Sequence, residues 1–259
     1  MGGGRTSMGI GGIAVLFVLS LIFGRDLISP VLQQQATQPA GPAGELQTTP
    51  QEEAKVLEIG KMLDDLQDTW SKLLGPRYQR STLVLFRGAT SSACGMGESA
   101  MGPFYCPGDQ KVYLDLEFFD ELDRRFGAPG DFAQAYVIAH EVGHHVQSLL
   151  GIERQVRGLQ QRSPGQANQL SVLMELQADC FAGVWGHSTA QRGILEPGDA
   201  EEGLRAAAAI GDDTLQQTTA GRVRPESFTH GSAAQRSEWL NRGLQSGQVK
   251  SCDTFAAGS

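Results

Sequence analysis

The sequence has few cysteines, and none of them form a pair of the zinc-ribbon kind. Four cysteines occur among 259 residues, without any C-x-x-C spacing. Because zinc ribbons present their thiolates from such pairs, this arrangement argues against a thiolate zinc module. Isolated cysteines suit disulfides formed in an oxidising compartment. The disulfide candidates are Cys94, Cys106, Cys180 and Cys252.

Positive charge is also scarce, and no basic patch is present. Lys and Arg number 21 against 29 Asp and Glu, which gives a net charge of -8. We therefore expect no nucleic-acid partner, because nucleic acids are bound through clustered basic side chains. The sequence shows no internal repeat, which argues against a solenoid. Residues 51–259 are numerous enough for a single domain with its own core.

One long apolar run lies near the N-terminus. Residues 8–24 carry no charge, a length at the short limit for a membrane-spanning helix and also compatible with a signal peptide. No small-x-small cleavage site or lipobox cysteine follows, so we predict an uncleaved anchor. Arg5 on the leading side favours a cytoplasmic segment over residues 1–7. The predicted topology is a single membrane crossing with the bulk of the chain on the extracytoplasmic side.

The residues after this run divide into a tether and a folded domain. Residues 25–50 are rich in Gln, Pro, Ala, Thr and Gly and predict a flexible linker. Apolar residues at helical spacing predict a helix over 51–74. Residues 81–87 and 111–116 read as short strands. The second is interpreted as an edge strand that presents backbone groups to an extended peptide.

The most informative motif is H-E-x-x-H, which lies within residues 139–145. His140 and His144 are four residues apart, so a helix presents both imidazoles to one ion, with Glu141 beside the open coordination position. This is the arrangement of a hydrolytic zinc site. The alternative is a surface pair of histidines, which the low chance frequency of the motif disfavours.

Local signals place this motif inside a long helix. We expect the helix to run from about 132 to 150, with Asp131 as its N-cap, Gln134 completing a capping box and Gly151 ending it. Gly143 interrupts the apolar pattern at a cost of about 0.5 to 1 kcal/mol relative to Ala. We therefore expect Gly143 to admit a close neighbour, namely the segment that carries a further metal ligand.

A catalytic zinc needs a third protein ligand. A metzincin would supply it from an extended motif, but Gln147 and Leu150 stand where that motif has Gly and His, so this class is excluded. A second helix, opening at 163–166 with Ser as N-cap and Pro at its first position, carries Glu175 and Asp179.

Glu175 and Asp179 are like charges at i,i+4, an arrangement that destabilises a helix unless a cation or donor lies between them. A metal with a bound imidazole would satisfy both. We predict that Glu175 is the third ligand and that Asp179 accepts a hydrogen bond from Nδ1–H of a ligating histidine. In isolation, the two carboxylates would instead form a solvated helix face.

The two metal motifs resemble those of a bacterial family of predicted neutral zinc metallopeptidases, a gluzincin-like group. The resemblance covers about residues 75–256 and is most specific at the two metal motifs. It implies a membrane-anchored protein of metallopeptidase type. Together with the topology above, it predicts a location in the bacterial inner membrane, with the catalytic domain on the extracytoplasmic side. The matching segments are His140-Glu141-x-Gly143-His144-His145-Val146-Gln147, Glu175-Leu176-Gln177-Ala178-Asp179-Cys180-x-Ala182-Gly183, Cys94-Gly95, Gly102 to Pro107, Phe228-Thr229-His230-Gly231 and Cys252-Asp253-Thr254-Phe255.

We therefore predict an α+β, zincin-like domain of gluzincin type with an active-site helix, a second ligand helix and a small β-sheet, preceded by a transmembrane helix. One Zn²⁺ per chain, held by His140, His144 and Glu175, would activate a water that Glu141 deprotonates for attack on a peptide or protein substrate. Two alternatives stay open. One is a non-catalytic envelope binding or scaffold protein, and the other is an amidase acting on cell-wall peptide.

Three other histidines are less determined by the sequence. His230 lies in a loop with glycine and is a candidate donor for the oxyanion of the reaction, with a cap of the following helix as the equal alternative. His145 is interpreted as a core histidine or as support for a ligand, because it is about 100° from His144 around the helix. His187 is left without a role.

Two disulfide pairings suggest themselves, although three connectivities are possible. A bond between Cys94 and Cys106 would close a short Gly-rich loop. A bond between Cys180 and Cys252 would tie the second ligand helix to the C-terminal segment. Burial of Cys180 as a free thiol is the alternative.

Overall fold

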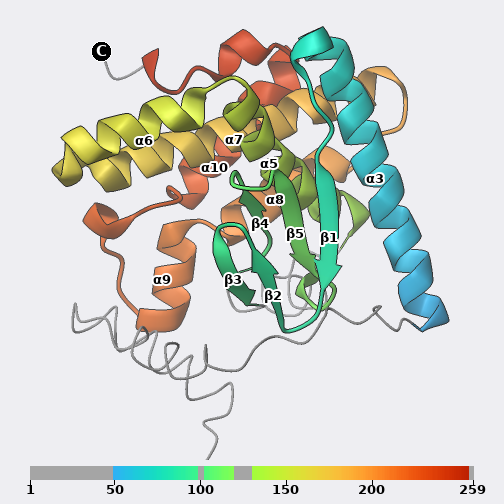
Figure 1. The fold of residues 1–259 in the computed structure, drawn as a ribbon, viewed down its shortest axis with the longest axis horizontal. Helices are drawn as coiled ribbons and strands as arrows, with labels where there is room; N and C mark the ends of the chain where they lie inside the picture. The colour runs from blue at the N-terminus through green and yellow to red at the C-terminus, as the bar shows by residue number, and fades with distance from the viewer. Residues whose placement is uncertain (1–48, 99–101, 120–129, 257–259) are drawn as a thin grey trace, which may run out of the picture. The chain divides into compact units, whose positions relative to one another are not determined.

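A computed structural model describes residues 49–98, 102–119 and 130–256. The described part is mixed α and β, mostly helical with a small sheet (Figure 1). No helix within it is long and apolar enough to cross a bilayer. The predicted anchor over residues 8–24 and nearly all of the predicted linker lie outside the described residues.

In the described part of the chain, five short strands form two sheets. The three-stranded sheet has the order β1-β5-β4, with β1 parallel and β4 antiparallel to β5. The two-stranded sheet pairs β2 with β3 in antiparallel fashion. The bounds are β1 (Thr82–Phe86), β2 (Ala89–Ser92), β3 (Gly95–Glu98), β4 (Phe104–Cys106) and β5 (Lys111–Asp115).

The predicted strands at 81–87 and 111–116 are confirmed as β1 and β5, but the prediction that the second is an edge strand was wrong. Val112 of β5 is paired on one side with Leu83 and on the other with Tyr105. The partner strand β4 is only three residues long, too short to show an alternating pattern in the sequence. The edges of this sheet are therefore β1 and β4.

The helical part is built around α5 (Asp131–Leu149) and α7 (Ala167–Gln191). The sheet packs against α5, α5 packs against α7, and α7 packs against α10 (Ala233–Ser246). The α5 helix has buried residues all round, as its apolar pattern predicts. The other helices are α3 (Pro50–Leu74), α6 (Ile152–Arg162), α8 (Asp199–Ala209) and α9 (Asp212–Ala220), with 3-10 turns η1 (Gly75–Arg77), η3 (Pro164–Gln166), η4 (Pro225–Ser227) and η5 (Val249–Cys252).

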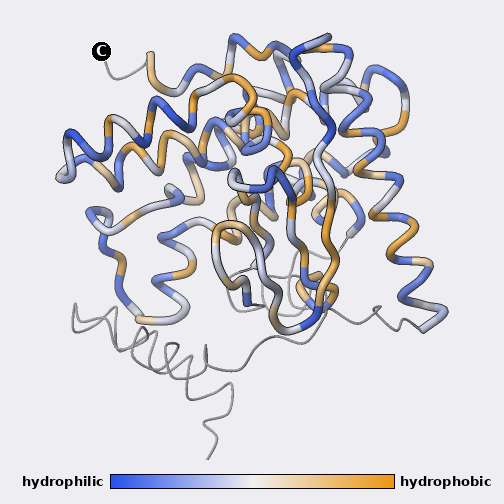
Figure 2. Tube along the Cα trace, viewed as in Figure 1, coloured by the Kyte–Doolittle hydropathy of each residue, from blue (hydrophilic) through white to orange (hydrophobic). Residues whose placement is uncertain are grey.

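The peripheral helices α3 and α6 each pack through one apolar face. The predicted helix over 51–74 is confirmed as α3, which buries Ile59, Leu66 and Trp70 in the core. Figure 2 shows α6 as alternating hydrophilic and hydrophobic turns, the mark of an amphipathic surface helix, and Val156 is its buried residue.

Both ligand helices exist, but neither predicted cap does. Asp131 is the first residue of α5, and the N-cap is Gly130, which has no side chain to make a cap bond. A carboxylate oxygen of Glu202 instead accepts a hydrogen bond from the Ala133 N–H at 2.8 Å. Likewise, the Ser163 side chain makes no cap bond, and a 3-10 turn precedes α7. Glu202 is far along the chain, so local sequence could not reveal this cap.

Two disulfides are present, and they are the two pairings suggested by the sequence. Cys94 is bonded to Cys106 across 12 residues, and Cys180 to Cys252 across 72 residues. No free cysteine is found. The second bond ties α7 to the C-terminal turn η5, immediately beside Asp179.

Candidate metal centre

A close crossing of α5 and α7 creates the site, and Gly143 makes the crossing possible. A Cβ atom at position 143 would lie 3.0 Å from the carbonyl oxygen of Ala178 and 3.1 Å from its Cα. Those are backbone atoms of α7, which cannot easily move aside. The prediction that Gly143 admits a close neighbour is confirmed, and that neighbour is α7, the helix that carries Glu175.

The three predicted ligands lie together where these helices cross. His140 Nε2 is 3.1 Å from Glu175 Oε2, and His144 Nε2 is 3.4 Å from Glu175 Oε1. One ligand atom from each residue falls within 4.8 Å of the others. In a tetrahedral site with bonds of 2.0 to 2.1 Å, neighbouring ligand atoms are about 3.3 Å apart. Two imidazoles and a carboxylate at these separations fit a zinc ion.

The ring of His140 is supported by a fully buried carboxylate, as predicted for Asp179. Its Nδ1 lies 2.8 Å from Asp179 Oδ1, so Nδ1–H donates and Nε2 is left to face the metal position. The hydroxyl of Tyr136 donates to the same carboxylate oxygen at 2.6 Å. Arg236 of α10 binds both oxygens of Asp179 at 2.9 Å through Nε and Nη2.

Charge is balanced within this buried group. Burial opposes protonation of His140, but Asp179 and Glu175 outweigh it and raise its pKa to about 10. Burial likewise opposes protonation of His144, and the Glu175 carboxylate raises the pKa of that ring. The pKa of Asp179 is lowered against the effect of burial, chiefly by Arg236 and then by His140. The two carboxylates thus favour positive charge at the position between the histidines. A divalent cation bound there would supply that charge in place of the protons on His140 and His144.

The ring of His144 has a neutral support. Its Nδ1 lies 2.8 Å from Oε1 of Gln147, which is itself fully buried. The Nε2 group of Gln147 donates to the carbonyl of Met174 at 2.7 Å and to Oε1 of Gln177 at 3.0 Å. The second predicted ligand is thus oriented by an amide where the first is oriented by a carboxylate.

Glu141 lies on the same helix as both predicted histidine ligands and is buried, with 8% of its surface exposed. Among the described residues, no hydrogen bond or ion pair engages its carboxylate, although its charge acts on the neighbouring His144. Both carboxylate oxygens are therefore available to take a proton. This freedom distinguishes Glu141 from Glu175 and Asp179, which are both committed to histidine rings.

His145 and His187 are structural. His145 is fully buried and faces β4, with Nδ1 3.1 Å from the Tyr105 hydroxyl and Nε2 2.6 Å from the Gln79 carbonyl. Burial lowers its pKa, so it is held neutral. His187 contacts the Leu244 carbonyl through Nδ1 at 2.7 Å, joining α7 to α10. Neither belongs to the ligand cluster.

His230 lies in the loop between α9 and α10, where Asp212 organises the backbone. One oxygen of Asp212 accepts hydrogen bonds from the N–H groups of Thr229, His230 and Gly231, at 2.7, 2.7 and 3.0 Å. The other lies 3.2 Å from His230 Nδ1. This hydrogen bond raises the pKa of His230, and the charge of Glu175 adds to the effect. The ring is half exposed and within electrostatic reach of the ligand cluster.

Sequence reasoning missed four residues of the site, which are Tyr136, Gln147, Asp212 and Arg236. Two of them carried a readable signal. Tyr136 precedes His140 by four residues and Gln147 follows His144 by three, so each shares a helix face with a ligand. Asp212 and Arg236 lie on separate helices, and nothing in their local sequence marks them.

Comparison with known proteins places the chain in a family. Residues 1–255 match the family described as "Putative neutral zinc metallopeptidase". The uncharacterized protein YpfJ of Escherichia coli strain K12 is 52% identical, over 98% of this chain and 89% of its own length. The uncharacterized protein Rv2575 of Mycobacterium tuberculosis is 46% identical, over 79% of this chain and 71% of its own length. No solved structure matches the chain. The chain therefore belongs to this zinc metallopeptidase family.

Proposed function

We propose that the protein is a zinc-dependent peptidase that hydrolyses peptide bonds by a water-activation mechanism. The observation that carries this proposal is the convergence of His140, His144 and Glu175 beside a carboxylate, Glu141, that is free to accept a proton. Zinc bound there would act as a Lewis acid, lowering the pKa of a bound water and polarising the substrate carbonyl.

The residues of the chain would then divide the work. Asp179 and Gln147 hold the two imidazoles with Nε2 toward the metal position. Glu141 takes the proton of the attacking water and returns it to the leaving amine, since it lies next to a ligand and is otherwise unengaged. Removal of such a proton acceptor typically costs about 10²- to 10⁴-fold in rate.

His230 is proposed as the donor to the oxyanion that forms at the attacked carbonyl. Asp212 accepts a hydrogen bond from Nδ1–H of His230 and raises the pKa of the ring, and in the protonated ring Nε2 also carries a proton that it can donate. Neither Glu141 nor the metal ligands can donate such a bond.

The anchor at residues 8–24 is proposed to hold this domain on the extracytoplasmic side, where both disulfides would be stable. A reporter active only outside the cytoplasm, fused after Ser259, tests that topology.

The central test is Glu141→Gln. We expect the purified variant to bind one zinc per chain, measured by atomic absorption, and to lose hydrolysis of a quenched-fluorescent peptide mixture by about 10²-fold or more. The matched control is Glu153→Gln on α6, a carboxylate outside the ligand cluster, which should leave both readouts unchanged. Loss of zinc from Glu141→Gln with turnover restored by added metal would show that Glu141 is a ligand and not the base.

The role of His230 has a separate test. His230→Ala should leave zinc content and folding nearly unchanged and should lower kcat and kcat/KM together by about 10²- to 10³-fold, as for an interaction made only in the transition state. Asp212→Asn should lower them less, because the ring is kept. A rise in KM alone would show that His230 binds substrate and takes no part in the chemistry.

A further inference from the structure

A chain of buried side-chain amides leads away from the metal centre. Gln147 of α5 touches His144, Gln177 of α7 touches Gln147, and the Gln177 Nε2 group donates to the Cys252 carbonyl at 2.9 Å. Gln147 is fully buried and Gln177 is 4% exposed. Two glutamines placed in contact in a core are costly unless all their polar atoms are paired, and here they are.

The two ends of the chain fix its direction. The Met174 and Cys252 carbonyls can only accept hydrogen bonds, so the amide atoms that face them must be nitrogens. It follows that Gln147 turns its oxygen toward His144, and Gln177 turns its oxygen toward Gln147. Two backbone carbonyls thus determine the orientation of both amides.

This direction sets the state of a metal ligand. Because Gln147 Oε1 accepts, His144 must carry a proton on Nδ1, and its Nε2 lone pair is then the one directed at Glu175 and the metal position. The reverse tautomer would set two acceptors, His144 Nδ1 and Oε1 of the fully buried Gln147, against each other. The energetic cost of such an unpaired buried group falls on the wrong tautomer alone.

We propose that Gln147 and Gln177 are positioning residues that hold His144 in its metal-binding tautomer and orientation. The proposal rests on the proposed zinc site and adds to it a support that neither the metal motifs nor the Asp179 group provides. The distant end of this support is the Cys252 carbonyl, which the disulfide to Cys180 fixes against α7.

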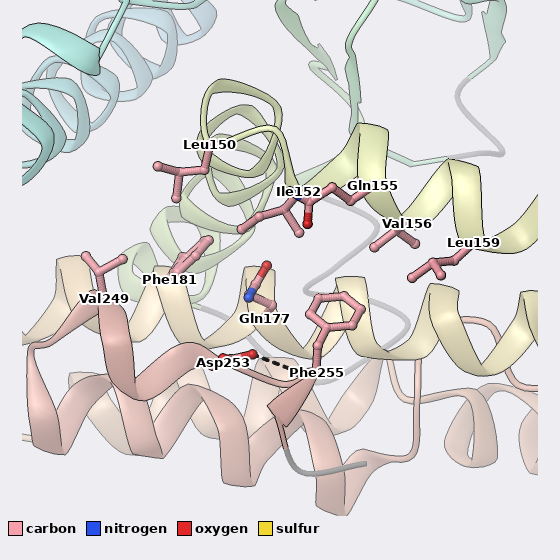
Figure 3. A pocket seen from close by; sticks show the side chains of 10 residues that line it. All are labelled: Leu150, Ile152, Gln155, Val156, Leu159, Gln177, Phe181, Val249, Asp253 and Phe255. Atoms are coloured by element: carbon pink, nitrogen blue, oxygen red, sulfur yellow. Dashed lines mark hydrogen bonds between the residues drawn. The ribbon is translucent and has the colours of Figure 1, made fainter. Parts of the chain in front are cut away.

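The surroundings of Gln177 agree with such a role. It lies in the wall of a cavity of about 430 Å³ between α6, α7 and the C-terminal segment, among mainly apolar side chains such as Val156, Phe181 and Phe255 (Figure 3). The Gln177 amide forms its hydrogen bonds with Gln147 and the Cys252 carbonyl, and none with the other residues that line the cavity. Its orientation is therefore set by the chain of amides and not by the cavity.

The test compares Gln147→Met and Gln177→Met, which keep length and remove every amide atom. Zinc affinity is measured by competition with a chromophoric chelator, with Zn²⁺ alone as the probe. We expect Gln147→Met to weaken binding by about 10- to 100-fold, as loss of a partner of a metal-bound histidine does. Gln177→Met should weaken it less, because Met174 still holds Gln147. Gln155→Met on α6 borders the same cavity without joining the chain, and serves as control.

A second readout separates positioning from packing. In zinc-loaded protein with ¹⁵N-labelled histidine, the Nδ1–H resonance of His144 should be strongly hydrogen-bonded in the parent and should shift upfield or exchange rapidly in Gln147→Met. The Nδ1–H of His140, held by Asp179, should not change. Circular dichroism establishes that each variant is folded, and Gln177→Met gives the same readout if Gln147→Met does not fold.

The outcomes distinguish this proposal from the proposed function. A parent protein that binds no zinc through His144 Nε2 would overturn both. A parent that binds zinc, with variants of unchanged affinity and an unchanged His144 resonance, would overturn the positioning role and leave the peptidase intact. Neither the zinc affinity nor the His144 resonance is measured with a substrate. Absence of peptide hydrolysis would therefore contradict the proposed activity and leave the positioning role unaffected.

Discussion

His140 and His144 lie one turn apart on α5 and face the same carboxylate of Glu175, yet different chemistry holds their second nitrogens. Behind His140 stands Asp179, which is bound by Arg236 and Tyr136. Behind His144 stands a neutral amide. The first support is ionic and reaches α10, whereas the second is made of dipoles and reaches the C-terminal turn. The candidate metal site is therefore connected to the fold through charge on one side and through the orientation of amides on the other.

This difference has a consequence for stability. A buried ion pair that loses one partner leaves an uncompensated charge, which is far more costly than an unpaired amide. Arg236 is 3% exposed and Asp179 is fully buried, so water cannot replace either. Changes behind His140 should thus disturb both folding and zinc binding, whereas changes behind His144 should act mainly on zinc binding.

The largest expected effect is that of Asp179→Asn. The variant leaves Arg236 without its counter-charge, so we expect the free energy of unfolding to fall by about 3–5 kcal/mol, measured by urea denaturation. Zinc affinity should fall about 10- to 100-fold. Asp68→Asn, which removes an exposed partner of Arg80, is the control and should cost no more than about 1 kcal/mol.

A double variant sharpens this result. Asp179→Asn with Arg236→Met removes the orphaned charge, and should regain most of the stability without regaining zinc affinity. If Asp179→Asn were no less stable than Asp68→Asn, the ionic support would not be coupled to the fold and the comparison would collapse.

How far the site could be predicted follows from where its parts lie in the chain. His140, Glu141 and His144 span about one helical turn, so their shared position on a helix could be predicted from spacing alone. Glu175 and Asp179 are like charges at i,i+4, which is unfavourable without a cation or donor between them, so their place beside the histidines could also be predicted from the local sequence. The role of Gly143 could be predicted because glycine destabilises a helix interior and nothing in the neighbouring sequence explains its presence there. The loop histidine His230 was noticed, but its partner Asp212 was not.

The parts that could not be predicted depend on distant contacts. Arg236 is 57 residues from Asp179 and lies in a helix whose capping box, between Ser232 and Gln235, looks ordinary. The cap of α5 comes from Glu202, so the local signal at Asp131 was misleading. Such pairings are set by the packing of whole helices, to which a single sequence gives no direct access.

The second prediction leaves the supports of both histidines unchanged and alters the spacing between α5 and α7. Gly143→Ala forces a methyl group against backbone atoms of Ala178, which cannot yield as a flexible side chain can. We expect a loss of about 2–3 kcal/mol in the free energy of unfolding, toward the upper end for overpacking. Zinc affinity should fall as well, because Glu175 is pushed away from both histidines.

Gly158→Ala on α6 is the matched control. That glycine is also helical, but open space surrounds the position of its Cβ, so the change should stabilise the protein by up to about 1 kcal/mol. If Gly143→Ala were equally harmless, the close approach of the two helices would not be what brings Glu175 to the histidines.

The smallest predicted effect concerns Tyr136, the neutral hydrogen-bond donor to the Asp179 carboxylate. Tyr136→Phe removes one hydroxyl that donates to Asp179 Oδ1, while Arg236 and His140 keep their bonds to the same carboxylate. The cost should be about 1.5 kcal/mol, at the low end for a hydrogen bond to a charged group. Tyr105→Phe removes a hydroxyl that contacts the structural His145, where the cost should be about 1 kcal/mol. Zinc competition separates the two, because only Tyr136→Phe acts on a carboxylate that orients a ligand. Equal zinc affinities would mean that Arg236 alone fixes Asp179, and the ionic support would reduce to that one pair.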